Sequence, residues 1–129
     1  MIRVVVTGVS GKMGGAICRG ILLEEDIKLV GAVSKSKSGI ELGKIIEDPN
    51  AGIITVKTIK EALNSNPEVL IDFTHASVAP DNIIFALENG IHTVVGTTGI
   101  DDQKIIEIKE KAEEVKANVI MAPNYAIGA

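Results

Sequence analysis

The residues with the clearest chemical potential are three glycines at regular spacing near the start of the chain, Gly8, Gly11 and Gly14. They follow an apolar run at residues 4–6 and precede a segment with helical periodicity. Glycine adopts backbone angles that a Cβ forbids, and it lets an anion approach the N–H groups of a helix's first turn, where the helix dipole favours negative charge. The spacing G-x-x-G-x-x-G differs from the commoner G-x-G-x-x-G, so the position after the first predicted strand is what indicates a phosphate-binding turn.

A second candidate is the loop at residues 34–38, in the region where dinucleotide-binding proteins place an acid against the ribose 2′-hydroxyl of NAD. This loop holds no acid and instead carries Lys35 and Lys37 between serines. Lysines and hydroxyls suit a 2′-phosphate, and a charge-assisted hydrogen bond contributes about 1.5–3 kcal/mol. The loop therefore predicts NADPH as the preferred cofactor, with NADH possible. The alternative is an exposed basic loop without a ligand.

Other polar positions near predicted strand ends allow more than one interpretation. Thr97 and Thr98, in a Gly-Thr-Thr-Gly turn, suit a ligand carboxylate or the nicotinamide amide, or belong to an ordinary strand-to-helix turn. Asp72, inside an apolar strand, is expected to be a structural acceptor for loop N–H groups, because buried polar groups are normally hydrogen-bonded, and a catalytic role is the alternative. His75 follows the same strand and is either a cofactor contact or loop surface, whereas His92 begins the next strand at the opposite edge. No serine or cysteine nucleophile pairs with these histidines in the sequence, and no ligand cluster indicates a metal.

Alternating strands and helices must bring these residues together. Helices are predicted at residues 12–25 and 101–116, with shorter ones starting at Thr58 and Ser77, and strands at residues 2–7, 27–34, 53–56, 69–73, 92–95 and 118–121. This alternation predicts an α/β fold with a Rossmann-type doubly wound, mostly parallel six-stranded sheet in the order 3-2-1-4-5-6. Ligands of such sheets bind beyond the carboxyl ends of the strands, so the loops at residues 8–14, 34–38, 74–75, 96–99 and 122–125 are expected to meet there.

The composition predicts one globular domain of 129 residues, 46% hydrophobic, with a net charge of −4, two Phe, one Tyr and no Trp. An acidic chain with few aromatics is not expected to bind nucleic acid, which requires a basic surface. No apolar run approaches the ~20 residues that span a bilayer, and the first strand starts at once, so we expect a cytoplasmic protein without a membrane partner. The single cysteine, Cys18, is expected to be a packing residue.

Four ordered motifs resemble those of one enzyme family: VTGVSGKMG at residues 6–14, IDFTH at 71–75, VGTTG at 95–99 and APNYAIG at 122–128. With them, the whole chain resembles the N-terminal half of 4-hydroxy-tetrahydrodipicolinate reductase, also called dihydrodipicolinate reductase. This is the nicotinamide-dependent reductase of bacterial lysine and diaminopimelate synthesis. The resemblance implies that residues 1–129 form a NAD(P)-binding Rossmann domain.

The resemblance also implies which residues bind the cofactor. They are Gly8, Val9, Ser10, Gly11, Lys12, Met13, Ser34, Lys35, Phe73, Thr74, Gly96, Thr97, Thr98, Ala122, Pro123, Asn124 and Tyr125. Tyr125 would lie beside the nicotinamide, and Thr98 would also bind a substrate carboxylate. Where some members of the family have an acid followed by arginine, this chain has Ser34 followed by Lys35, which agrees with the predicted preference for NADPH.

The family's proton donor and substrate contacts come from a second, C-terminal domain, through a His-His-x-x-Lys run that this sequence does not contain. That domain also builds a homotetramer. In the intact enzyme, hydride passes from NAD(P)H to C4 of the ring derived from 4-hydroxy-tetrahydrodipicolinate, a small dicarboxylate, and water is lost to give tetrahydrodipicolinate. The resemblance thus implies a domain that binds cofactor without turnover, with no catalytic residue and no metal ligand of its own. The alternatives are a related NAD(P)-dependent amino-acid dehydrogenase and a stand-alone nucleotide-sensing module.

Overall fold

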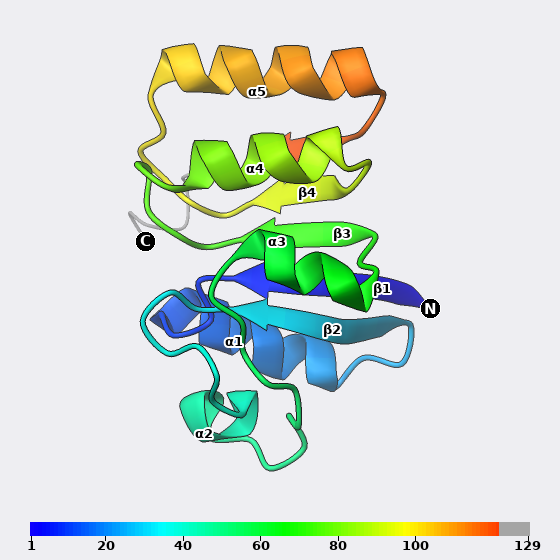
Figure 1. Cartoon of the computed structure of the whole chain (residues 1–129), viewed down its shortest axis with the longest axis vertical. Helices are drawn as coiled ribbons and strands as arrows, with labels where there is room; N and C mark the ends of the chain where they lie inside the picture. The colour runs from blue at the N-terminus through cyan, green and yellow to red at the C-terminus, as the bar shows by residue number, and fades with distance from the viewer. Residues whose placement is uncertain (122–129) are drawn as a thin grey trace.

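A computed structural model describes residues 1–121, and its centre is a sheet of five parallel strands (Figure 1). The strands lie in the order β2-β1-β3-β4-β5, and every neighbouring pair is parallel. Their bounds are β1 Ile2–Thr7, β2 Ile27–Val33, β3 Val69–Asp72, β4 His92–Val95 and β5 Val119–Met121. The strand order reverses beside β1, and all five carboxyl ends lie at one edge of the sheet. Doubly wound sheets bind their ligands at this point.

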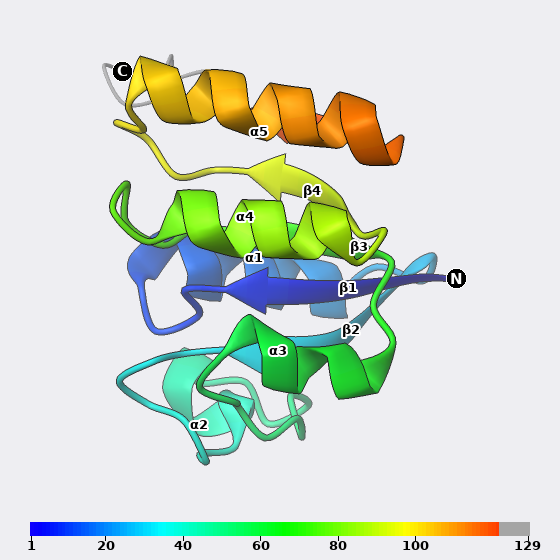
Figure 2. The ribbon, with the colours of Figure 1, turned by 45° about the horizontal axis from the view of Figure 1, so that its top comes forward.

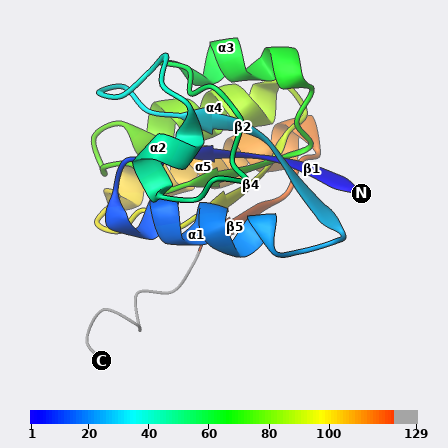
Figure 3. The ribbon, with the colours of Figure 1, turned by 90° about the horizontal axis from the view of Figure 1, so that it is seen from below.

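Helices cover the sheet in two layers (Figures 1 and 2). On one face lies α1 (Lys12–Leu22), and the short α2 (Leu42–Ile46) lies beside it beyond the β2 edge of the sheet. Apolar side chains of both helices join one core cluster. On the other face lie α3 (Ile59–Ala62), continued by the 3-10 turn η1 (Leu63–Ser65), and then α4 (Ala79–Glu88) and α5 (Asp102–Val115). Figure 3 shows α1 and α3 on opposite sides of β1. None of the helices within residues 1–121 is both long enough and apolar enough to cross a bilayer.

The consecutive valines of β1 form a strand that is buried on both faces. Val4 and Val6 pack into the cluster under α1, whereas Val5 packs into the cluster under α3 and α4. Their exposed fractions are 3%, 0% and 0%. An apolar run without alternation is typical of a central parallel strand, because both of its faces are covered by helices.

One predicted strand is wrong, and the sheet consequently has five strands where six were predicted. Residues 53–56 form only two isolated bridges, one antiparallel between Ile54 and Glu41 and one parallel between Val56 and Val33. The segment divides its backbone hydrogen bonds between the loop at residues 40–42 and the end of β2, so no ladder forms with either partner. The remaining five predicted strands all form, and their order is the predicted order with the third strand removed.

The outer part of the sheet face that carries α1 stays exposed. Ile71, Val94 and Ile120 are aligned across β3, β4 and β5 by the strand register. Ile71 packs at the rim of the cluster under α1, and Val94 is half-buried. Ile120 is 61% exposed, which is a large fraction for an isoleucine within a strand.

Candidate functional site

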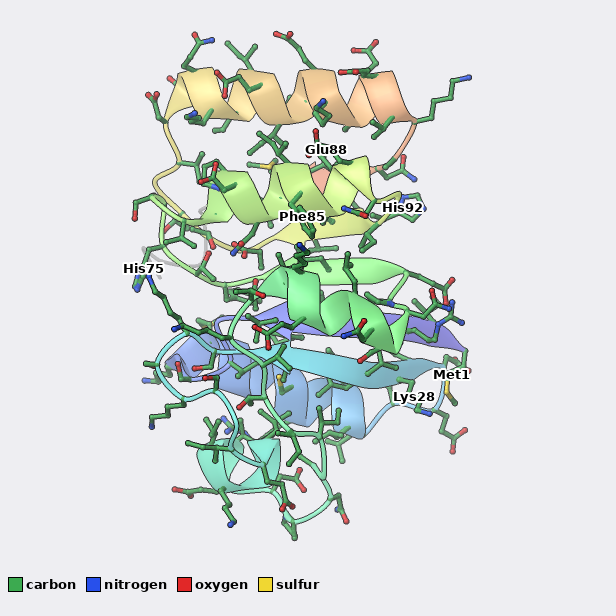
Figure 4. The ribbon with its side chains drawn as sticks, in the orientation of Figure 1. Met1, Lys28, His75, Phe85, Glu88 and His92 are labelled. Atoms are coloured by element: carbon green, nitrogen blue, oxygen red, sulfur yellow. The ribbon has the colours of Figure 1, made fainter. Side chains whose placement is uncertain are left out.

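An open cleft of about 810 Å³ lies beyond the carboxyl ends of β1, β2 and β3. Its lining includes the residue that directly follows each of these strands, Gly8, Ser34 and Phe73. Figure 4 shows His75, which follows β3, at this end of the sheet, and His92 at the other end. The cleft therefore lies at the edge that the sequence predicted, where the strand order reverses.

Two of the three glycines in the turn after β1 are required by the fold. Gly8 has a φ of +80°, and a Cβ there would overlap the Phe73 carbonyl group, because the carbonyl carbon would lie only 2.6 Å from that Cβ. A Cβ on Gly14 would lie 2.8 Å from the Gly8 carbonyl carbon and 3.1 Å from the Val9 Cα, because α1 starts directly against the turn. Both obstacles are backbone atoms, which cannot move aside without displacing a strand or a helix.

Gly11 is not required in this way. It is the N-cap of α1, with φ −83° and ψ 164°, angles that any residue adopts. A Cβ there would meet only the Gly8 carbonyl oxygen, at 3.4 Å, and no side chain caps the helix. Gly11 lines the cleft, so its missing side chain leaves space in front of the first N–H groups of α1. A phosphate fits this space, since helix N-termini offer unpaired donors and a favourable dipole.

Ser34 and Lys35, in the loop after β2, have different environments. Ser34 is 2% exposed, donates a hydrogen bond to the Ser10 hydroxyl at 3.2 Å and accepts one from the Lys37 N–H at 3.0 Å. It thereby joins this loop to the glycine turn. Lys35 is exposed and lines the cleft, whereas Lys37 is exposed outside the lining. Of the two lysines predicted for a 2′-phosphate, only Lys35 is placed on the cleft wall.

Sequence reasoning missed a second pair of cleft lysines, Lys57 and Lys60. They lie just after residues 53–56, whose carboxyl end was not included among the loops expected at the site. A signal was present, because threonine at position 58 and glutamate three residues later are typical of a capping box, which marks the start of a helix. In the structure the Thr58 hydroxyl accepts a hydrogen bond from the Glu61 N–H at 3.3 Å. The Glu61 carboxylate accepts a hydrogen bond from the Thr58 hydroxyl, at 3.2 Å, and not from the Thr58 backbone N–H.

The cleft differs in charge from the rest of the chain. Within the described residues its lining contains three lysines and one histidine but no Asp or Glu. The chain as a whole has 17 acidic and 13 basic residues. A basic cleft in an acidic protein raises the local concentration of anions and favours an anionic ligand.

Apolar side chains of α3 and of the α4 region complete the lining. Ile59, Val78 and Phe85 contribute apolar surface, and Asn82 adds an amide between the last two. Ile59 and Phe85 belong to the same core cluster, and Figure 4 shows Phe85 on the side of α4 that faces α3. Apolar walls with one amide suit the faces and polar edge of an aromatic base. No sequence pattern indicated this wall, because the segment that starts at Ser77 was predicted only as a helix.

Asp72 organises the loops behind the cleft as a structural acceptor, as the sequence predicted. It is fully buried at the end of β3 and accepts hydrogen bonds from three threonine hydroxyls. These belong to Thr7 at the end of β1, Thr74 after β3 at 3.0 Å and Thr97 after β4 at 2.7 Å. The main donors are hydroxyls where N–H groups were expected, since only the Thr74 N–H contributes, at 3.5 Å. The carboxylate thus ties three strand ends together.

The structure brings seven of the predicted cofactor contacts into the cleft. They are Gly8, Ser10, Gly11, Ser34, Lys35, Phe73 and Thr74. Six others lie outside its lining, namely Val9, Lys12, Met13, Gly96, Thr97 and Thr98. Ala122, Pro123, Asn124 and Tyr125 lie outside the described residues. Val9 is a core residue at 1% exposure, and Gly96 leaves room for the Phe73 ring, which a Cβ there would overlap.

The remaining candidate groups serve the fold. Cys18 is fully buried on the sheet-facing side of α1, and burial raises the pKa of its thiol from the ordinary 9.0 to about 12, with Arg19 opposing that shift. This environment agrees with a packing role. His92 accepts a hydrogen bond from the Asn118 N–H at 3.0 Å, far from the cleft. Across residues 1–121 no three His, Cys, Asp or Glu side chains are grouped so that they could hold a metal.

Comparison with known proteins identifies the family. A sequence family described as "Dihydrodipicolinate reductase, N-terminus" matches residues 2–125. The chain belongs to this family. The 4-hydroxy-tetrahydrodipicolinate reductases of Moorella thermoacetica and Carboxydothermus hydrogenoformans are 40% and 38% identical to it over 99% and 100% of the chain. The chain spans 48% and 49% of those two proteins, or about half the length of the curated relatives.

Solved structures show the same architecture. The dipicolinate-bound dihydrodipicolinate reductase from Paenisporosarcina sp. TG-14 has a TM-score of 0.80 and 27% identity, covering 99% of this chain and 49% of that one. GenD2 from gentamicin A biosynthesis, solved in complex with NAD, has a TM-score of 0.81 at 17% identity, covering 97% of this chain and 35% of its own. The second likeness concerns the fold alone. The dihydrodipicolinate reductase N-terminal domain is thus an α/β Rossmann-like domain with a five-stranded parallel sheet.

Proposed function

We propose that this chain is the NAD(P)H-binding domain of a 4-hydroxy-tetrahydrodipicolinate reductase of lysine and diaminopimelate biosynthesis. The observation that carries the proposal is a basic cleft without acidic side chains, at the point where the strand order reverses. The glycine turn after β1 forms part of its lining, and Gly11 in this turn leaves room for a ligand. Family membership supports the reaction, and the cleft supports the cofactor. We also propose that this biosynthetic enzyme acts in the cytoplasm, the location expected from the sequence.

In this proposal the pyrophosphate of the cofactor binds at the start of α1, next to Gly8, Ser10 and Gly11. The loop of Ser34 and Lys35 binds the 2′-phosphate, so NADPH is preferred and NADH is possible. The cofactor supplies the hydride. The family resemblance adds residues 122–125 as further cofactor contacts, with Tyr125 beside the nicotinamide, and Thr98 near a substrate carboxylate.

The other half of the intact protein would supply the proton donor, most contacts to the dicarboxylate substrate and the tetramer interface. The exposed face at Ile120 is a surface that such additional chain could cover. The chain alone is then expected to bind NAD(P)H without reducing substrate. A measurable reductase rate from residues 1–129 would contradict this division of labour.

The cofactor assignment is tested by titrating the chain with NADPH and with NADH in a calorimeter. NADPH is expected to bind about 10- to 100-fold more tightly. Lys35→Glu should remove at least tenfold of that preference, whereas Lys37→Glu, on the same loop but outside the cleft, should leave it within about twofold. Tighter binding of NADH to the unmodified chain would overturn the NADPH assignment, and binding of neither would overturn the cofactor role.

A further inference from the structure

We propose that Lys57 and Lys60 bind the 2′-phosphate of NADPH together with Lys35, so that two separate chain segments determine cofactor selectivity. The inference rests on the proposed function, because it assumes a nicotinamide dinucleotide in the cleft. It adds two residues that lie outside the four motifs of the family resemblance. All three lysines line the same cleft.

The backbone places Lys57 beside the loop that carries Lys35. Val56 forms a parallel bridge with Val33, the last residue of β2. The Ser34 N–H donates to the Val56 carbonyl oxygen at 2.9 Å, and the Val56 N–H donates to the Ala32 carbonyl oxygen at 3.0 Å. Because the bridge is parallel, both segments leave the sheet at the same edge and in the same direction. Lys57 therefore starts its loop next to Ser34.

The start of α3 fixes Lys60 on the same side of the cleft. The Thr58 hydroxyl accepts a hydrogen bond from the Glu61 N–H, and Ile59 is 6% exposed in the cluster beneath α3. With Ile59 held in the core, the neighbouring Lys60 extends from the first helical turn to the cleft, where it is part of the lining. The residues 53–56 do not extend the sheet, but their single bridge to β2 positions this second basic segment.

The three lysines are available for a ligand. The ion pairs found within residues 1–121 involve Arg3, Lys104 and Lys111 as cations, and none involves a cleft lysine. The lining contains no carboxylate within the described residues that could neutralise them. A dianionic phosphate satisfies several ammonium groups at once, whereas the uncharged 2′-hydroxyl of NADH does not.

The alternative is that these lysines bind the pyrophosphate, and the two possibilities predict different binding data. Lysines at the pyrophosphate would strengthen the binding of NADPH and NADH equally, because both cofactors carry that group. Lysines at the 2′-phosphate would strengthen the binding of NADPH alone. The bridge to the end of β2 favours the 2′-phosphate, since the loop after β2 lies at the ribose of the adenosine half in Rossmann folds.

The experiment compares Lys57→Gln, Lys60→Gln and the double variant with the unmodified chain, by calorimetric titration with NADPH and NADH. Lys28→Gln is the matched control, because Lys28 is an exposed lysine of β2 at the opposite end of the sheet (Figure 4). Titration with adenosine 2′,5′-bisphosphate and AMP isolates the 2′-phosphate from the nicotinamide half. Circular dichroism melts establish that each variant is folded.

Each single variant should weaken NADPH binding about threefold and the double variant about tenfold, which with the tenfold share of Lys35 stays within the expected preference for NADPH, and NADH should be affected less than about twofold. The bisphosphate should follow NADPH, and AMP should follow NADH. Unchanged NADPH affinity in the double variant, or equal losses for both cofactors, would overturn the inference while leaving the proposed function intact. Failure of the unmodified chain to bind either cofactor would overturn the proposed function and this inference with it.

Discussion

Substituting the glycines of the turn after β1 one at a time separates what the fold needs from what a ligand needs. Gly14→Ala places a methyl group against the carbonyl of Gly8, 2.8 Å from its carbon, whereas Gly11→Ala places one 3.4 Å from the Gly8 oxygen with nothing else nearby. The two substitutions have the same chemistry and lie three residues apart. They should nevertheless damage different properties of the protein.

The magnitudes follow from these contacts. At Gly14, inside α1, alanine gains about 1 kcal/mol of helix propensity, but overpacking against backbone costs about 1–3 kcal/mol or more, so the chain is destabilised overall. At the N-cap, Gly11→Ala costs less than about 1 kcal/mol of folding stability. Its methyl group would displace a phosphate from the first-turn N–H groups, and losing one charge-assisted hydrogen bond weakens binding by about 1.5–3 kcal/mol, or roughly 10- to 150-fold.

Urea denaturation without cofactor measures stability, and calorimetric titration with NADPH measures binding. The expected pattern is a stable Gly11→Ala variant with weak NADPH binding and a Gly14→Ala variant with a lowered free energy of unfolding. If Gly11→Ala binds NADPH as tightly as the unmodified chain, the space in front of α1 is not a phosphate site. If Gly14→Ala is as stable as the unmodified chain, the steric argument is wrong.

Three further outcomes are expected. Thr97→Val removes a hydrogen-bond donor from buried Asp72 and should lower the free energy of unfolding by about 1.5–3 kcal/mol. Thr98→Val, at an exposed position, should change it by less than about 0.5 kcal/mol. Equal effects would contradict the structural role of the hydrogen bonds to Asp72. The raised pKa of the Cys18 thiol keeps it neutral in the folded state while the unfolded thiol ionises. The contribution of this thiol to the free energy of unfolding should therefore be full below pH 9.0 and decrease by about 1.4 kcal/mol per pH unit between pH 9.0 and about pH 12. Urea denaturation at alkaline pH should show that Cys18→Ala removes this part of the pH dependence. Ile120→Thr should change the free energy of unfolding by less than about 0.5 kcal/mol, because the side chain is 61% exposed, and a larger loss in urea denaturation would contradict the exposure of this face.

The sequence predicted the regular strands and helices correctly but not the irregular segment at residues 53–56. Five strands, their order and the long helices could be predicted, because apolar runs and capping residues act over a few neighbouring positions. Residues 53–56 were wrongly predicted as a strand for the same reason. Their apolar content suits a strand, but their bridge partners, Glu41 and Val33, lie far away in the sequence. Local pattern carries no information about how a segment divides its bonds between two distant partners.

By itself the sequence determined the fold class, the edge of the sheet where the cleft lies, and the four family motifs, of which the first contains the Gly8 turn. Glycine spacing and β-branched runs constrain the local backbone directly, so these features are readable without coordinates. Only the tertiary structure showed that Gly11 is the one glycine of Gly8, Gly11 and Gly14 with room for a side chain. It also showed that Thr97 bonds Asp72 outside the cleft lining and that Lys57 and Lys60 join Lys35 in that lining. The physical reason is that contacts across a cleft depend on which chain segments the sheet brings side by side, and hydrogen bonds between residues distant in sequence decide that.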